Sequence, residues 1–132
     1  MKLITGITTK NEEWIIDKTL NIVTKFSDTV IVYDDGSTDR TEEICKSYDN
    51  VVWRVRPEHD PLLREEAKQR LELIEIISQF NPEYVLLLDA DEIPTPNIVN
   101  FISSIKTENS DTNIFRVRMI NLWEDESKYR VD

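Results

Sequence analysis

Two carboxylates two positions apart, Asp89 and Asp91, directly follow an apolar run in the segment YVLLLDADEIP. In an extended segment, side chains two residues apart point the same way, so both carboxylates are expected to face one spot. Such groups repel each other unless a cation lies between them, and their hard oxygen atoms suit Mg²⁺ or Mn²⁺. We therefore interpret the pair as a candidate metal site. The alternative is that these acids cap the following turn or lie in solvent, and for Glu92 a cap, a salt bridge and a direct role all stay open.

Two further polar stretches follow apolar runs earlier in the chain, TTKN at residues 8–11 and DDGS at residues 34–37. In open α/β sheets, ligands bind beyond the carboxyl ends of the strands. If the three apolar runs are parallel strands, the three polar stretches lie on one rim. An acid at a strand end can accept hydrogen bonds from ribose hydroxyls or a base N–H, which makes Asp34 and Asp35 candidate nucleotide ligands. Gly36 would allow a tight turn and the close approach of a ligand.

Basic residues are concentrated between the two acidic stretches, at Arg54, Arg56, Arg64, Lys68 and Arg70. Arg64 and Lys68 are four residues apart on a predicted helix and share a face, from which they could neutralise a diphosphate. The alternative is that they pair with neighbouring glutamates in solvent.

The composition is that of a globular domain with 132 residues and a net charge of -10. This charge argues against a nucleic-acid-binding surface, which needs a basic stripe. It also means that a phosphate-bearing ligand needs a metal ion or a local cluster of arginines. No stretch approaches the roughly 20 apolar residues of a membrane span. The single cysteine, Cys45, excludes an internal disulfide and fits a reducing compartment such as the cytoplasm.

The apolar pattern predicts strands over residues 2–8, 29–33, 51–55 and 84–88. The run at 84–88 is apolar on both faces, as in a central parallel strand covered by helices. Residues 113–120 alternate between apolar and polar side chains and predict a further, less buried strand, for which an antiparallel position at an edge stays open. With helices between the strands, we expect a single α/β domain over residues 1–132, with a mostly parallel sheet and helices on both faces.

Four helices are predicted between and after these strands. The first lies within residues 9–26, with Thr9 and Glu12 or Asn11 as cap, and the second over residues 41–48, capped from residues 37–39. The third begins at Asp60 and Pro61, and its predicted buried stripe is Leu63, Ala67, Leu71, Ile74 and Ile77. The fourth begins at Pro96, with an inward stripe of Ile98, Ile102 and Ile105.

In order and spacing, the segments TKNEE, VIVYDDGSTDRTEEI and YVLLLDADEIP resemble those of the family 2 glycosyltransferases, which have the GT-A fold. The resemblance covers about residues 3–106. It implies an enzyme that moves a sugar from a nucleotide diphosphate, commonly UDP, to an acceptor, with inversion at the anomeric carbon. It also implies that Thr8, Asn11 and Glu12 flank the nucleotide base and that Asp34 or Asp35 binds the uracil or ribose.

For the other end of the donor, the resemblance implies that Asp89 reaches the ribose and sugar and that Asp91 holds Mn²⁺ or Mg²⁺ on the diphosphate. These two aspartates would form the catalytic centre. Arg64 and Lys68 fall where the family often has basic residues that face the donor.

One departure from the family pattern concerns the general base, an Asp or Glu that deprotonates the acceptor hydroxyl. The family usually carries it well past the D-x-D, and here only about forty residues follow, with late acids at Glu124, Asp125 and Glu126. We therefore expect the donor-binding part of a transferase, with the part that binds a saccharide, lipid or protein acceptor missing or minimal. The expected location is cytoplasmic, or peripheral at the cytoplasmic face of the membrane.

Two alternatives to a transferase stay open. One is a non-catalytic module that binds sugar nucleotides. The other is a phosphoacceptor receiver domain, which fits less well because its acidic pair would follow the first strand.

Overall fold

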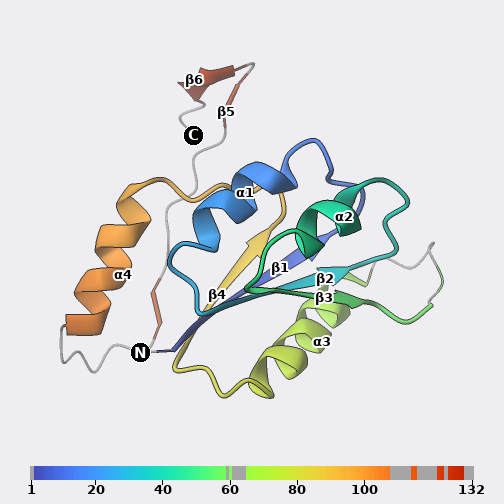
Figure 1. The fold of residues 1–132 in the computed structure, drawn as a ribbon, viewed down its shortest axis with the longest axis horizontal. Helices are drawn as coiled ribbons and strands as arrows, with labels where there is room; N and C mark the ends of the chain where they lie inside the picture. The colour runs from blue at the N-terminus through green and yellow to red at the C-terminus, as the bar shows by residue number, and fades with distance from the viewer. Residues whose placement is uncertain are drawn as a thin grey trace.

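The computed structural model describes residues 2–58, 60, 65–107, 114–115, 122–123 and 125–129. Its centre is a sheet of four parallel strands in the order β3-β2-β1-β4 (Figure 1). The strands are β1 (Leu3–Thr9), β2 (Thr29–Asp34), β3 (Val51–Val55) and β4 (Tyr84–Asp89). The predicted α/β class and parallel sheet are confirmed.

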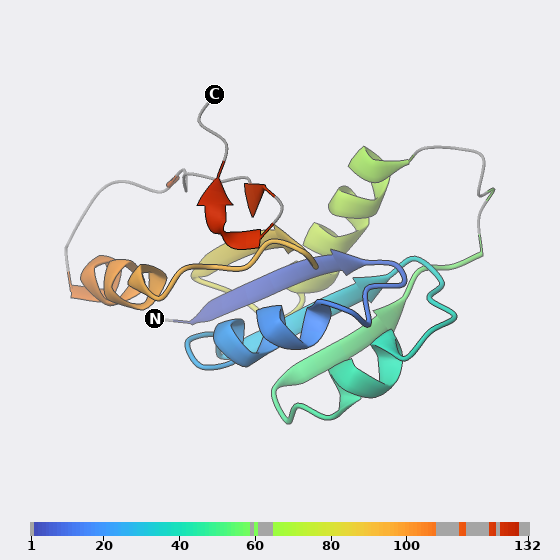
Figure 2. The same ribbon diagram turned by 90° about the horizontal axis from the view of Figure 1, so that it is seen from above.

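Helices cover both faces of the sheet (Figures 1 and 2). One face packs against α1 (Ile16–Val23), α2 (Thr41–Lys46) and α4 (Asn97–Thr107). The other face packs against α3 (Glu66–Ser78). Because successive residues of a strand point to opposite faces, each strand contributes alternate side chains to the two layers of core.

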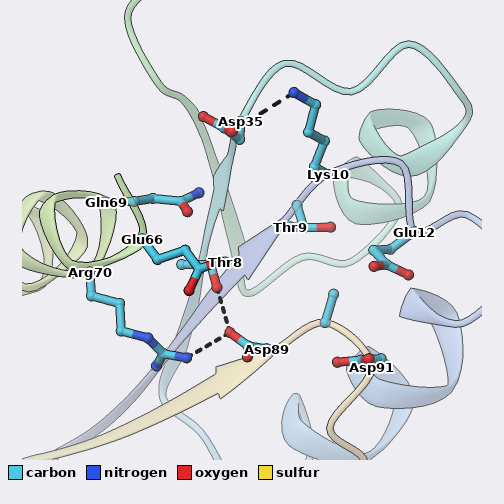
Figure 3. Close-up of a pocket in the computed structure, with 11 residues that line it drawn as sticks. Thr8, Thr9, Lys10, Glu12, Asp35, Glu66, Gln69, Arg70, Asp89 and Asp91 are labelled. Atoms are coloured by element: carbon cyan, nitrogen blue, oxygen red, sulfur yellow. Dashed lines mark hydrogen bonds and ion pairs between the residues drawn. The ribbon is translucent and has the colours of Figure 1, made fainter. Parts of the chain in front are cut away.

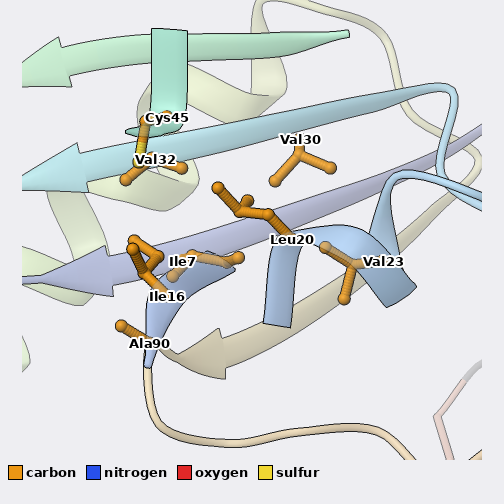
Figure 4. Packing of buried hydrophobic residues seen from close by; sticks show 8 residues of the cluster. All are labelled: Ile7, Ile16, Leu20, Val23, Val30, Val32, Cys45 and Ala90. Atoms are coloured by element: carbon orange, nitrogen blue, oxygen red, sulfur yellow. The ribbon is translucent and has the colours of Figure 1, made fainter. Parts of the chain in front are cut away.

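The layer beneath α1 and α2 is built from aliphatic side chains that are fully removed from solvent (Figure 4). Ile7 of β1 and Val30 and Val32 of β2 meet Leu20 of α1 and Cys45 of α2. Complete burial of one such side chain contributes roughly 1.5–3 kcal/mol. Cys45 is fully buried and is therefore a core residue, and this burial raises the pKa of its thiol to about 12.

The opposite layer depends on a close approach between α3 and β1. Ile4, Ile31 and Tyr33 of the sheet pack against Leu73 and Ile77 of α3. Gly6 lies directly beneath the helix, and a Cβ atom at this position would be 2.6 Å from the Ile77 Cδ1 atom. The missing side chain of Gly6 therefore sets how closely α3 lies on the sheet.

Two predictions about α3 were wrong. In the described residues the helix begins at Glu66, after the start predicted at Asp60. Its inward stripe is formed by Leu73, which was not predicted, and Ile77, which was, and the predicted Leu63 lies outside the described residues. Leu71 is 63% exposed and Ile74 43% exposed. Most residues from 71 to 77 are apolar, so two neighbouring faces of the helix both fit the helical spacing of apolar residues. The face that carries Leu73 and Ile77 is the one that packs on Gly6.

The predicted cap was wrong for the first helix and agrees with the structure for the second. Among the described residues, no side chain caps α1, and the backbone carbonyl of Glu12 accepts the N–H groups of Ile15 and Ile16. At the start of α2, the carboxylate of Asp39, one of the three predicted caps, accepts the N–H of Thr41 at 3.0 Å.

β4 lies at the edge of the four-stranded sheet and is only partly buried, so the prediction of a central strand was wrong for the part of the chain that the structure describes. One side of β4 packs against Ile98 and Ile102 of α4, as predicted for that helix. A small antiparallel pair, β5 (Leu122–Trp123) and β6 (Asp125–Tyr129), was not predicted. Most of the strand predicted at residues 113–120 lies outside the described residues. Across the described ranges, no helix is long and apolar enough to span a bilayer.

Candidate functional site

The carboxyl ends of β1, β2 and β4 meet at one edge of the sheet, because Thr8 is in register with Asp89 and Thr9 with Asp34. A cleft of about 430 Å³ opens at this edge (Figure 3). It is lined by Thr8, Thr9, Lys10, Glu12, Asp35, Glu66, Gln69, Arg70, Asp89, Ala90 and Asp91. The structure thus brings together most of the predicted site residues, from three strand ends and the first turns of α3.

Asp89 is held by protein groups on the α3 side of the sheet. Its Oδ1 atom accepts a hydrogen bond from the Thr8 hydroxyl at 2.8 Å and is 2.8 Å from the Arg70 Nη2 atom. Its backbone N–H donates to the Glu92 carboxylate at 2.7 Å. Glu92 therefore stabilises the turn after β4, and Arg70 offsets the charge of Asp89.

Asp91 does not point to the same spot as Asp89, contrary to the expectation for an extended segment. β4 ends at Asp89, and the chain turns at Ala90, whose carbonyl accepts the Thr19 hydroxyl at 2.7 Å. This turn directs the Asp91 carboxylate toward the side of the cleft where Glu12 lies (Figure 3). No hydrogen bond or ion pair to Asp91 is formed by the residues that the structure describes.

The donor set at the cleft fits a divalent cation only in part. The described residues contain no group of three or more His, Cys, Asp and Glu side chains able to hold a metal ion. A single free carboxylate at Asp91 nevertheless fits Mg²⁺ or Mn²⁺, because such ions often take one or two carboxylates and complete their shell with water and phosphate oxygens.

The two aspartates after β2 differ in their surroundings. Asp34 is 2% exposed, and its carboxylate accepts the N–H groups of Gly36 at 2.9 Å and Ser37 at 2.8 Å. Asp35 lines the cleft, where its carboxylate lies 3.9 Å from Lys10 Nζ and 3.3 Å from Arg56 Nη1. Asp34 thus shapes the tight turn at Gly36, whose φ is 87°, and Asp35 faces the cleft.

Asn11 joins two loops and does not line the cleft. Its N–H donates to the Ser37 hydroxyl at 2.8 Å, and its side-chain carbonyl accepts the Thr38 N–H at 2.7 Å. Its backbone is left-handed, with a φ of 54°, which Asn tolerates better than most residues. Asn11 therefore fixes the loop that carries Thr9 and Glu12.

Thr9 and Glu12 each present a buried oxygen without a hydrogen-bond partner in the described structure, Thr9 Oγ1 and Glu12 Oε2. Both residues line the cleft, and Thr9 is 5% exposed. A buried polar atom left unpaired costs about 1–3 kcal/mol, so a ligand that pairs with these atoms recovers that cost. Glu12 was predicted as a site residue, whereas Thr9 was not.

The basic residues that line the cleft are Lys10 and Arg70, and the predicted Lys68 does not line it. Lys68 is exposed, lies 3.3 Å from the Glu65 carboxylate and does not line the cleft, and Arg64 lies outside the described residues. Arg70 could have been found from the stripe of Leu73 and Ile77, since it lies three and seven residues before them on the same helical face.

The acidic residues near the end of the sequence cannot be assigned as the general base from the described structure. Glu124 lies outside the described residues, and Asp125 and Glu126 belong to β6, where the structure describes the backbone.

Comparison with known proteins identifies a family. The model of the family described as glycosyl transferase family 2 matches residues 5–130. Two uncharacterised proteins, from Mycobacterium bovis and Mycobacterium tuberculosis, are each 30% identical over 131 residues, which is 95% of this chain and 31% of theirs. The chain therefore spans less than a third of the length of these relatives.

Two solved structures of glucosyl-3-phosphoglycerate synthase from Mycobacterium tuberculosis share the fold. The complex with Mn²⁺, UDP and glucosyl-3-phosphoglycerate has a TM-score of 0.59 at 22% identity, over 78% of this chain and 38% of that one. The complex with UDP has a TM-score of 0.61 at 21% identity, over 82% and 41%. Together with the family match, this similarity confirms the expected GT-A fold.

Proposed function

Because this chain belongs to glycosyl transferase family 2, we propose that it is the donor-binding part of an enzyme that transfers a sugar from a nucleotide diphosphate to an acceptor. The observation that carries the proposal is the cleft at the strand ends, which Asp35 and Asp91 both line and where no described residue pairs with the Asp91 carboxylate. UDP is the first donor nucleotide to test, since the solved structures that share the fold are complexes with UDP.

The base and ribose would lie at the end of the cleft formed by the loops after β1 and β2. The Asp35 carboxylate would accept a base N–H or a ribose hydroxyl. Thr9 and Glu12 would provide further partners through the oxygens that pair with none of the described residues. Thr8 and Asn11 would act mainly through other residues, since Thr8 donates to Asp89 and Asn11 fixes the loop.

The diphosphate and sugar would lie at the β4 end. Asp91 would hold Mn²⁺ or Mg²⁺, which supplies Lewis acidity that offsets charge on the departing diphosphate. Arg70, which can donate to phosphate oxygens as well as to Asp89, would take the role expected of Arg64 and Lys68. Asp89 would orient Arg70 and reach the sugar side.

Inversion requires a base on the acceptor hydroxyl, and we propose that the base and the acceptor site belong to parts of the protein other than the described cleft. Saccharides, lipids and proteins all carry hydroxyl groups that could serve as the acceptor. We also propose a cytoplasmic location, supported by the single buried and reduced Cys45.

Titration calorimetry with UDP, with and without Mn²⁺, tests the proposal. We expect wild-type protein to bind UDP in the presence of Mn²⁺, and Asp91→Asn to lose most of that binding. Asp49→Asn is the matched control, because it removes the same charge from an exposed position in the turn before β3, outside the cleft. Absence of binding by the wild type, or equal binding by Asp91→Asn, would contradict the proposal.

Turnover separates a transferase from a non-catalytic module that binds sugar nucleotides. Release of UDP from a UDP-sugar, dependent on Mn²⁺ and on Asp91, would support a transferase. Tight binding without release in the presence of candidate acceptors would favour the module.

A further inference from the structure

We propose that Arg56 is a positioning residue that holds the Asp35 carboxylate in place to recognise the nucleoside part of the donor. The inference rests on the proposed function. Arg56 does not line the cleft, so it would act through Asp35 and not on the ligand itself.

The Arg56 guanidinium is buried and contacts three carboxylates, one from the loop after β2, one from the residue before α3 and one from within α3. Its side chain is 4% exposed. Nε donates to Glu72 at 2.9 Å, Nη2 to Glu65 at 2.9 Å and Nη1 to Asp35 at 3.3 Å. Each of the three nitrogen atoms therefore has its own carboxylate.

The guanidinium is anchored by Glu72, Glu65 and the backbone of Arg56, none of which lines the cleft. Glu72 lies within α3 and also accepts the Tyr33 hydroxyl at 2.9 Å, and Glu65 directly precedes the helix. The Arg56 N–H donates to the Asp34 carbonyl at 2.8 Å, which fixes the start of the side chain next to β2. Because the guanidinium is planar and its Nε and Nη2 atoms are already held by Glu72 and Glu65, the direction of the third nitrogen, Nη1, toward Asp35 is fixed.

The position of Asp35 depends on this arrangement because a second cation lies on the cleft side. Lys10 Nζ is 3.9 Å from the other oxygen of the same carboxylate, and its side chain is half exposed. Without Arg56, Asp35 would lose its buried partner and rotate toward Lys10. A carboxylate that has rotated no longer presents its oxygens where a base or ribose needs them.

Lysine cannot replace Arg56 in this role. Its ammonium is a single point charge, whereas three carboxylates are here reached from three nitrogen atoms of a rigid plane. Arg56→Lys would keep the charge and lose the geometry, while Arg56→Gln would lose both.

Calorimetric titration of UDP and of inorganic pyrophosphate, each with Mn²⁺, tests the inference. We expect Arg56→Gln to weaken UDP binding by about tenfold, which is typical of the loss of a hydrogen bond to a charged group. We expect Arg56→Lys to weaken UDP binding by less. Pyrophosphate binding should stay unchanged, because it does not use Asp35. Tyr33→Phe is the control, since it removes one hydrogen bond from Glu72 and leaves the Asp35 contact in place.

A double-mutant cycle distinguishes positioning from loss of stability. In the Asp35→Asn background, Arg56→Gln should have little further effect on UDP binding, because the two residues act as a unit. If both ligands bind more weakly to each Arg56 variant, or if the effects of Asp35→Asn and Arg56→Gln add, the inference is overturned. If Arg56→Gln does not fold, Arg56→Lys decides by the same comparison.

The outcomes also separate this inference from the proposed function. If the wild type does not bind UDP with Mn²⁺, the proposed function fails and the inference fails with it. If the wild type binds UDP and both Arg56 variants bind it equally well, only the inference fails.

Discussion

Aspartates in the two acidic motifs have different surroundings, although the sequence presents them as equivalent. Asp34 accepts hydrogen bonds from its own turn, and Asp89 is paired with Thr8 and Arg70. Asp35 lines the cleft between two cations, Arg56 and Lys10, whereas Asp91 receives no hydrogen bond or ion pair from the described residues. The differences arise from the turns that follow β2 and β4.

Asp89→Asn should destabilise the metal-free protein, because it weakens the contacts with Thr8 and Arg70. This is opposite to what simple repulsion between Asp89 and Asp91 would give. The ion pair is partly exposed, so we expect a loss of about 1 kcal/mol. Asp91→Asn, which removes the same charge, should change stability by less than about 0.5 kcal/mol. Urea denaturation in EDTA measures both, and equal effects would contradict the assignment.

Glu72 should make the stability of the protein depend on pH. The hydrogen bond from Arg56 is the largest cause that holds the pKa of Glu72 below its usual value of 4.5, and Tyr33 adds to it. A carboxyl whose pKa is lower in the folded state stabilises the fold above its unfolded pKa and loses this effect as pH falls through the folded value. The loss due to Glu72 should therefore appear below about pH 4.5.

Urea denaturation of Glu72→Gln from neutral pH down to about pH 3 tests this dependence. We expect the variant to be less stable at neutral pH and to lose less stability than the wild type on acidification. Glu75→Gln removes one charge from an exposed position of the same helix and serves as the control. Parallel curves for the wild type and Glu72→Gln would contradict the prediction.

At the scale of elements, the contact between Gly6 and α3 is a tight constraint on the packing. A Cβ atom at residue 6 would lie 2.6 Å from Ile77 Cδ1 and 3.1 Å from Leu87 Cδ2, so Gly6→Ala should displace these side-chain ends in the layer between β1 and α3 and cost about 1–3 kcal/mol. Ile77→Val deletes the clashing atom. In urea denaturation, the double variant should therefore lose less stability than the sum of the two single variants. Additive losses would show that another contact sets the position of the helix.

The sequence predicted the strands better than it predicted α3. Each β-branched run is bounded by polar residues, so strand ends were predicted to within about one residue. Leu71 and Ile74 compete with Leu73 and Ile77 for the inward face, and only the packing on Gly6 decides between them. Similarly, an apolar run such as residues 84–88 indicates that other elements pack on the faces of the strand. It does not indicate whether the strand has a hydrogen-bonded neighbouring strand on each side.

On the scale of the whole molecule, the rule that parallel strands end at one rim was enough to place Asp35 and Asp91 at the same cleft. The same rule could not predict which basic residues lie near the cleft, because that depends on which face of α3 packs on the sheet. Arg56 at the end of β3 and Arg70 on α3 were therefore only two of five candidates by sequence. The buried network around Arg56 joins residues 35, 65 and 72, and no local pattern predicts such a contact.

The net charge of -10 leads to the last prediction, that binding of UDP and of Mn²⁺ is strongly coupled. A diphosphate that approaches an acidic protein is repelled, and Arg70 is already paired with Asp89, so a divalent cation at Asp91 should supply most of the missing positive charge. We expect Mn²⁺ to strengthen UDP binding by at least about tenfold, within the usual range of coupling between sites. By linkage, UDP must strengthen Mn²⁺ binding by the same factor. Calorimetric titrations of UDP with and without Mn²⁺, and of Mn²⁺ with and without UDP, measure the two factors. In Asp91→Asn both factors should approach one, which means no coupling. Equal UDP affinity in EDTA and in Mn²⁺ would show that the protein neutralises the diphosphate without a metal.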